Sequence, residues 1–483
     1  MKIVHSMLVA GDIGTLLRFL PTALVQTFNL HPRMRALQVK DEDFMAEIQA
    51  PLTLQTIAND NLLRIRKFTT TTNTTGITDT NGAFEDWEKY AEDECNAGFD
   101  RYSQFPFFLT VWTDEEAEQA RLMLFSDHYM SDGYSGMVVL NCILERIAVL
   151  ANQEVGEKQS EEASVEEFPL RPSVYQMWLS KVAWAKPLMK GAISLLGKTI
   201  YQSEMQKFNP VLPARADQHD FTMPPVANPT TASFAQGDPL CMRQALAKCK
   251  EEGVTFAGAL VGAIVLAFYH AAKSQPSFDP EQPFKIMADL DYNMRQRVPL
   301  PAEEDQVGMY VAFSDLGWLA NQGVDVHTVR FWDLARRAKT EIDRNLRHTL
   351  TMAATTFILD RRIHAKMNPS FAKALNIRHS QTSDTNISNV GRYPYTQRHN
   401  LSDNGKTRVL AVKNLHVYNP IPHLGPSATL FLSSVESFNY AMGHKCEHDA
   451  AKSLFKAWVT ICEAIGSIDT DEILIDVLHR LHL

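Results

Sequence analysis

The chain has 483 residues, of which 45% are hydrophobic and 21% are charged, a composition typical of a globular protein. This length is enough for about two to four domain-sized units with a sizeable buried core. A formal net charge of -9 and a pI of about 6.0 argue against a nucleic-acid partner, which would require a basic face.

The six cysteines are scattered along the chain, and none forms a C-x-x-C pair. Such spacing is typical of reduced thiols rather than of a disulfide framework, and it predicts no metal site. The apolar run near the N-terminus is short, Asp12 interrupts it, and no clear cleavage site of a signal peptide follows. We therefore expect a cytoplasmic protein.

Helix-like and strand-like segments alternate along the chain, which predicts an α/β or α+β protein. Apolar residues recur at helical spacing over 13–27. A strand-like run over 121–127 leads directly into a polar turn that contains glycine. A strong helical pattern then runs from Ser135, a candidate helix cap, through Val149.

The middle of the chain contains two further segments of note. Residues 174–201 carry an apolar helical stripe, interrupted by Pro187, with lysines off the stripe. Core packing is the favoured interpretation, and weak membrane or lipid contact is the alternative. The following segment, 208–240, is rich in proline and predicts a connector between two halves.

The longest uncharged apolar stretch covers 254–272 and contains many small residues. Its length and hydrophobicity are marginal for a membrane span, which needs about twenty strongly apolar residues. It therefore predicts a buried helix capped near Thr255.

One pattern carries chemistry: His128-x-x-x-Asp132-Gly133 at the end of the strand-like run. A neutral hydroxyl is a poor nucleophile, so acyl transfer to an alcohol needs a base, and an imidazole near neutral pKa can take that proton. A turn between strand and helix exposes the ring and fixes its position. Gly133 permits a tight backbone there, and Asp132 can order the turn by pairing with a cation.

Several weaker motifs follow each other in one order. They are His31-Pro32-x-x-Arg35, the turn at His128, a V-T-x-x-x-x-L helix over 254–260, Asn293-Met294-Arg295, Asp305-Gln306-Val307-Gly308 and Ser388-Asn389-Val390-Gly391. Together they resemble the coenzyme A-dependent acyltransferase superfamily, which includes chloramphenicol acetyltransferase, condensation domains, alcohol acetyltransferases and mycobacterial polyketide-associated acyltransferases. The resemblance covers nearly the whole chain.

The resemblance implies an α/β (α+β) fold of two chloramphenicol acetyltransferase-like subdomains, each a mixed β-sheet flanked by helices, with a tunnel between them. On this basis we expect residues 1–207 to form the N-terminal subdomain, 208–240 the connector and 241–483 the C-terminal subdomain. One chain would then suffice as a monomer.

The resemblance also implies the roles of particular residues. His128 would be the general base, Asp132 would pair with Arg295 to support the turn with Gly133, and a loop with Ser388 and Asn389 would lie near the reacting carbonyl. A hydrogen-bond donor there could steady the oxyanion. Without the resemblance, Arg295 would be read as a solvated loop residue. For Asn389, turn chemistry is the favoured interpretation.

The expected reaction is acyl transfer from acyl-coenzyme A, as co-substrate, to a small alcohol or amine, in a ternary complex and with no bound cofactor or metal. This describes an acyl-coenzyme A-dependent O-acyltransferase. Two alternatives stay open: a condensation-type transferase that uses an acyl carrier protein, and a non-catalytic binding or scaffold relative. The presence of all of His128, Asp132, Gly133 and Arg295 speaks against the last.

The sequence also departs from the superfamily pattern. Asp127 stands where many relatives carry the first of two histidines, and the plant D-F-G-W-G motif is absent, although Asp315-Leu-Gly-Trp318 looks similar at an earlier position. His444-Lys-Cys-Glu447-His448 matches a zinc-protease pattern. Catalytic zinc needs a third protein ligand, so a loop between strand and helix is the favoured interpretation.

Overall fold

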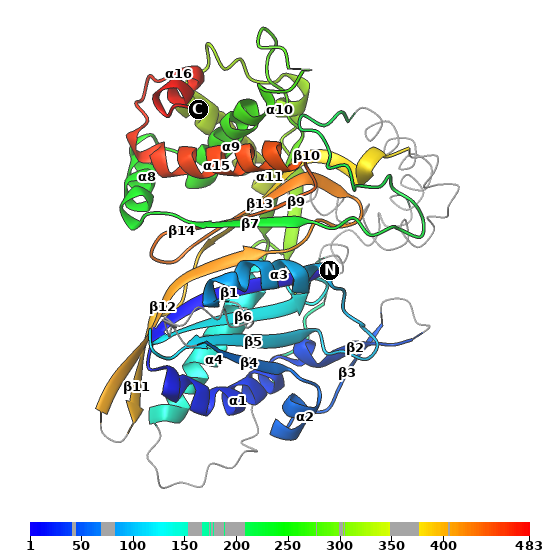
Figure 1. Ribbon diagram of the computed structural model, residues 1–483, viewed down its shortest axis with the longest axis vertical. Coiled ribbons are helices and arrows are strands. Elements are labelled where there is room, and N and C mark those ends of the chain that lie inside the picture. Colours follow the sequence, from blue (N-terminus) through cyan, green and yellow to red (C-terminus); the bar gives the residue numbers. More distant parts are fainter. Residues whose placement is uncertain are drawn as a thin grey trace, which may run out of the picture.

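The computed structural model describes residues 1–40, 45–68, 83–152, 167–172, 174, 177, 188, 208–276, 278–298, 303, 305–347, 376–403 and 406–483. Two six-stranded sheets lie one above the other in Figure 1, each with helices against it. The expected architecture of two sheets flanked by helices is thereby confirmed. Each sheet has its own apolar core.

The first sheet has the strand order β11-β12-β1-β6-β5-β4. Helices α1 and α4 contact each other below it in Figure 1, and α3 packs between β1 and the second sheet. Because both faces are covered, every residue of β5 is buried. The elements are β1 (Lys2–Gly11), α1 (Ile13–Leu30), α2 (Leu54–Asn59), β4 (Leu63–Phe68), α3 (Trp87–Asn96), β5 (Phe107–Asp114), β6 (Gln119–Asp127), α4 (Gly133–Asn152), β11 (Arg398–Asp403) and β12 (Lys406–Tyr418), with the small pair β2 (Ala36–Gln38) and β3 (Ala46–Ile48) beside α1.

The second sheet has the order β7-β14-β13-β10-β8-β9. Helix α9 lies across its outer face and contacts both α11 and α15. The elements are β7 (Thr231–Gln236), α8 (Pro239–Glu251), α9 (Phe256–Ala272), β8 (Ala288–Asn293), β9 (Val311–Asp315), α10 (Gly317–Asn321), α11 (Phe331–Arg347), β10 (Gln381–Arg392), β13 (Gly425–Ser434), β14 (Phe438–His444), α15 (His448–Ala464) and α16 (Leu474–Arg480).

The two sheets do not divide the chain at a single boundary. Strands β11 and β12, from the second half of the chain, complete the first sheet, and β12 pairs antiparallel with β1. Strand β7, which lies within the predicted connector 208–240, is an edge strand of the second sheet and pairs with β14. The sheets therefore cross the boundaries predicted from a consecutive reading of the sequence, because pairing between distant strands is invisible in local patterns.

The predicted helix at 254–272 is confirmed as α9, and Thr255 caps it, since its Oγ accepts a hydrogen bond from the Gly258 amide at 3.4 Å. Almost all of α9 is buried. Among the described helices, α4 alone is long and apolar enough to cross a membrane, and 72% of that apolar window is buried inside the protein. Helices α8 and α9 would qualify only as one span, yet they meet at 109°.

Most of the predicted helix over 174–201 lies outside the described residues. Of this segment, Val174 and Met177 are buried in the core of the second sheet, whereas Leu188 is 72% exposed. The prediction of membrane or lipid contact by this segment stays open.

Helices α9 and α11 approach each other closely at Gly258, where an added Cβ would lie 2.6 Å from the Ala335 carbonyl oxygen. We predict that Gly258→Ala lowers the free energy of unfolding by about 1–3 kcal/mol, because backbone atoms of α11 cannot yield as a flexible side chain would. Urea unfolding measures the change. Gly98→Ala is the control, since no atom lies within 4 Å of its added Cβ. Equal stability of both variants and the wild type would show that the helices separate without cost.

Candidate active site

The candidate site is built on the turn between β6 and α4. Its backbone is anchored at the start, where the His128 amide donates to the Met1 carbonyl oxygen at 3.0 Å. Asp127, the last residue of β6, is 2% exposed and accepts hydrogen bonds from Arg101 Nε and Nη2 at 2.5 and 3.1 Å. The residue that replaces the first histidine of many relatives therefore holds the turn by an ion pair.

The His128 imidazole is partly exposed. Its Nδ1 atom is buried and has no hydrogen-bond partner among the described residues. An uncommitted imidazole nitrogen of this kind can accept a proton from a hydroxyl or amine.

Asp132 and Arg295 form a buried ion pair between the turn and the segment that follows β8. Arg295 Nη1 lies 2.9 Å from Asp132 Oδ2, and Nη2 lies 3.0 Å from Oδ1, while the two side chains are 2% and 0% exposed. The amides of Ser135 and Tyr310 donate to the same carboxylate, each at 2.8 Å. The structure therefore brings together two residues that lie 163 positions apart in the chain.

The pKa of Asp132 is lowered despite its burial. Burial alone would raise it, but the charge and hydrogen bonds of Arg295, together with the amides of Tyr310 and Ser135, outweigh that effect. Since its carboxylate binds the Ser135 amide, Asp132 is the cap of α4. The expectation that Ser135 caps this helix was wrong, because Ser135 lies inside the first turn.

The hydroxyl of Ser135 instead joins the buried network around the ion pair. It accepts a hydrogen bond from Arg295 Nη2 at 2.8 Å and one from the Gly308 amide at 3.0 Å. The rings of Tyr134 and Tyr310 lie 4.7 and 4.9 Å from the Arg295 guanidinium carbon. Gly308, part of the Asp305–Gly308 motif, is thereby placed directly beside the turn.

A buried histidine lies behind the turn. His5 on β1 is 0% exposed, and its Nε2 atom lies 2.9 Å from the Gly133 carbonyl oxygen. Its ring occupies the place that a side chain at Gly136 would take, since an added Cβ there would lie 2.1 Å from Nδ1. Burial lowers the pKa of His5 to about 4, against weaker opposing effects of the Gly133 carbonyl and Asp132. His5 is therefore neutral near pH 7.

Strand β10 of the second sheet meets the turn from the other side. An added Cβ on Gly133 would lie 3.1 Å from Val390 Cγ2, so the strand end packs against this glycine. Asn389 Oδ1 accepts from the Gly391 amide at 3.2 Å, which is turn chemistry. Ser388, which is partly buried, hydrogen-bonds toward Asp291 on β8; burial raises the pKa of that carboxyl, and Asn386 and Ser388 oppose the rise.

Two residues around the site were missed from the sequence, and a third was given another role. His5 and Asp291 carry no local signal, because each acts across a strand pairing or a subdomain contact. Ser135 was noted, but for another role. The structure places His128, Asp132, Gly133, Arg295, Ser388 and Asn389 around the same junction of β6, β8, β10 and α4.

His444 and Glu447 of the zinc-protease pattern have structural partners. His444, the last residue of β14, has its Nδ1 atom 3.2 Å from the Cys446 carbonyl oxygen. The Glu447 carboxylate caps α15 by accepting from the amides of Asp449 and Ala450. Across the part of the chain that the structure describes, no three His, Cys, Asp or Glu side chains are grouped as metal ligands.

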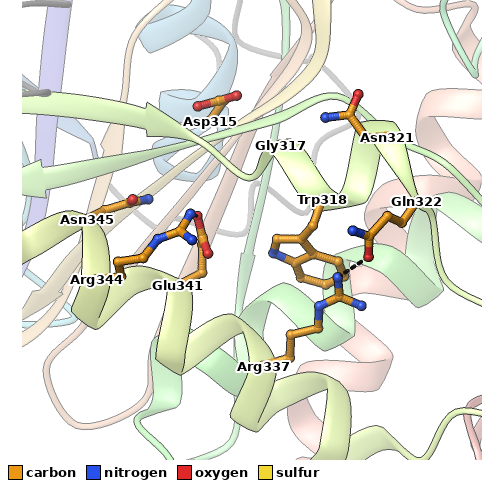
Figure 2. A pocket seen from close by; sticks show the side chains of 9 residues that line it. All are labelled: Asp315, Gly317, Trp318, Asn321, Gln322, Arg337, Glu341, Arg344 and Asn345. Atoms are coloured by element: carbon orange, nitrogen blue, oxygen red, sulfur yellow. Dashed lines mark hydrogen bonds and ion pairs between the residues drawn. The ribbon is translucent and has the colours of Figure 1, made fainter.

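A separate hollow of about 550 Å³ lies between α10, α11 and the end of β9. Figure 2 shows the Trp318 indole next to the Arg337 side chain, whose guanidinium carbon lies over the ring, 4.1 Å from its centroid. The Asp315–Trp318 sequence that resembles the plant motif therefore lines this hollow. His128 is not among the lining residues, so the hollow is distinct from the candidate active site.

A family model matches most of the chain. A model described as alcohol acetyltransferase matches residues 81–404, more than half of the chain, and this range contains His128, Arg295 and Ser388. No curated protein matches the chain.

Solved structures with the same fold have low sequence identity to this chain. TRI3 trichothecene 15-O-acetyltransferase from Fusarium sporotrichioides has a TM-score of 0.63 at 11% identity, covering 96% of this chain and 91% of that one. Polyketide synthase associated protein 5 from Mycobacterium tuberculosis has 0.57 at 13%, covering 96% and 94%. The first condensation domain of the calcium-dependent antibiotic synthetase has 0.58 at 11%, covering 98% and 93%. These likenesses confirm the expected fold; function must be argued from the site.

We predict that Asp132→Asn and Arg295→Met each lower the free energy of unfolding by about 3–5 kcal/mol, because each leaves a buried charge or its hydrogen bonds unpaired. The double variant should cost less than the sum, since neither charge then remains alone. Chemical unfolding of all four proteins tests this. Additive losses would mean that the two side chains do not act as a unit.

A second prediction concerns pH and His5. Its folded-state pKa of about 4 lies below the ordinary 6.5, so the unfolded state binds a proton that the folded state refuses. The stability that neutral His5 provides is complete above about pH 6.5 and is lost as the pH falls toward 4. Relative to His5→Gln, the wild type should lose stability over this window.

The wild type must be compared directly with His5→Gln, because the titration of other buried groups changes the stability of the protein in the opposite direction. Burial raises the pKa of Asp384 to about 7 and that of Asp289 to about 6, and such groups favour the folded state at lower pH. Unfolding at pH 7.5, 6 and 5 gives the difference. The control is His327→Gln, at an exposed position. A difference between wild type and His5→Gln that stays constant with pH would contradict the prediction.

Proposed function

The chain belongs to the alcohol acetyltransferase family, and we propose that it transfers an acyl group from acyl-coenzyme A to a hydroxyl or amine acceptor, with His128 as general base. The family and the condensation-type fold support an acyltransferase. The donor, the acceptor class and the role of His128 are the proposal.

One observation carries the proposal: the turn that bears His128 is locked to the second subdomain at two points. The Asp132–Arg295 pair joins it to the end of β8, and Gly133 packs against Val390 on β10. The partly exposed imidazole of His128 is therefore attached to a turn that is held at the junction of two subdomains. Such rigid placement is what general base catalysis requires.

The proposed reaction proceeds in a ternary complex without an acyl-enzyme. His128 Nε2 takes the proton of the acceptor as its oxygen or nitrogen attacks the thioester carbonyl. The tetrahedral intermediate collapses, the carbon–sulfur bond breaks, and the imidazolium returns its proton to the thiolate of coenzyme A. In this scheme the protein supplies a base and a fixed geometry, and acyl-coenzyme A is a co-substrate rather than a bound cofactor.

The proposed oxyanion donor is Ser388, because it lies on the wall that faces the turn. Its hydroxyl is engaged by Asp291, so it would rotate when the oxyanion forms. Asn389 is less suited, since its side-chain oxygen is committed to the Gly391 amide. A tunnel between the subdomains for donor and acceptor, a monomeric state and a cytoplasmic location all stay predictions.

Acyl-coenzyme A donors of graded chain length, offered with mixed alcohols and amines, test the proposal through thiol release. We predict acceptor-dependent release by the wild type and a loss of about a hundredfold or more in His128→Ala. His327→Ala, a histidine exposed on the second subdomain, is the matched control and should keep full activity.

Other outcomes point elsewhere. A mutant as fast as the wild type would remove His128 as the base. Release from carrier-bound thioesters alone would favour the condensation-type alternative. No transfer from either donor would favour a binding protein that has kept the fold.

A further inference from the structure

The hollow between α10, α11 and the end of β9 has a polar wall. Its volume of about 550 Å³ falls within the range of small-molecule sites. Of the side chains that line it in the described part of the chain, the Trp318 indole alone is largely apolar. The others are two carboxylates, two guanidinium groups and three side-chain amides, so their formal charges cancel. Such a wall favours a polar ligand without net charge.

Several polar groups of this wall hold each other in place. The Arg337 guanidinium lies over the Trp318 ring, and its Nη2 atom donates to Gln322 Oε1 at 2.5 Å. Arg344 forms an ion pair with Glu341 one turn away on α11. The two arginines are therefore already engaged within the wall. Groups that are ordered before a ligand arrives lose less conformational entropy when it binds.

Three other groups of the wall have no hydrogen-bond or ion-pair partner among the described residues. The Nε1–H of Trp318 is buried and unpaired, which is costly for a donor. The Asp315 carboxylate and the Asn321 amide are exposed, and each stands clear of the other labelled side chains in Figure 2. An added Cβ on Gly317 would lie 3.1 Å from Asp315 Oδ2 and 3.8 Å from Asn321 Nδ2, so both groups flank the space beside this glycine.

The chemistry of these three groups limits the ligand. A carboxylate only accepts hydrogen bonds, an indole N–H only donates, and an amide does both. An ammonium ion could donate to Asp315 but could not accept from Trp318. A carboxylate ligand could accept from Trp318 but could not donate to Asp315. A hydroxyl group donates and accepts and carries no charge, so a molecule with several hydroxyls meets all three requirements.

We propose that this hollow is a second binding site of the protein, for an uncharged polyhydroxylated molecule such as a sugar or a cyclic polyol. Hydroxyls of the ligand donate to the Asp315 carboxylate, another accepts from Trp318 Nε1–H, and the Asn321 amide completes the set. Hydrogen bonds to the charged carboxylate are the strongest of these. His128 does not line the hollow, so the site does not depend on the proposed acyl transfer.

The indole N–H resonance of Trp318 reports on the hollow directly. The chain has seven tryptophans, and this resonance is assigned by its loss in Trp318→Phe. Glucose, sucrose and myo-inositol are each titrated into the full chain and followed by ¹H–¹⁵N NMR. Acetate and ethylammonium serve as charged comparison compounds. We expect at least one of the three polyhydroxylated probes to shift the resonance in a saturable way at millimolar concentration, and neither ion to do so.

Asp315→Asn tests the placement of the ligand, because asparagine keeps the shape of the side chain and removes the charge. We expect it to weaken binding of that probe about tenfold or more, as the loss of a hydrogen bond to a charged group does. The matched control is Asp476→Asn, an exposed aspartate on α16 that does not line the hollow. It should bind as the wild type does. Circular dichroism confirms that both variants are folded.

Three results would overturn the proposal. The first is a Trp318 resonance that none of the three polyhydroxylated probes moves. The second is a response to acetate or ethylammonium alone, which would make the hollow an ion site. The third is equal affinity in the wild type and Asp315→Asn, which would place the ligand elsewhere. Because binding is measured without turnover, a protein that fails to transfer acyl groups rejects the proposed function and leaves this test intact.

Discussion

The arrangement of the site depends on one buried ion pair, Asp132 with Arg295. Two charges that are almost fully buried cost several kcal/mol in lost hydration, and the pair offsets this by satisfying the carboxylate with the guanidinium and two backbone amides. A well-packed apolar contact could hold two subdomains together at lower cost. The ion pair also fixes the orientation of the turn, because its hydrogen bonds can form in only one register of the turn against the end of β8.

The two subdomains therefore contribute different parts of the site. The first supplies the turn, with Asp127 held by Arg101 in front and His5 packed behind. The second supplies the facing wall from β8 and β10. A base that is held by rigid surroundings needs little reorganisation when charge develops on it. The acid–base chemistry that we propose would thus depend on a contact between subdomains rather than on either one alone.

The same logic explains how proteins with 11–13% identity share this fold. Each core tolerates exchange of one apolar residue for another of similar volume. Gly136 and Gly133 do not tolerate exchange for a larger residue, because the His5 ring and Val390 occupy the space that a side chain would take. Interleaving of the chain strengthens the contact further, since β12 lies in the first sheet and touches β13 and β14 of the second.

The sequence by itself determined the alternation of helices and strands, the buried helix α9 with its Thr255 cap, the turn that bears His128 and the superfamily. These features depend on neighbours in the chain, so periodicity and short motifs reveal them. Only the tertiary structure decided that Asp132 caps α4, that His5 supports Gly133, and that β7, β11 and β12 lie in the sheets where they do. Each of these depends on residues far apart in sequence, and strand pairing and burial are set by the whole chain rather than by any local pattern.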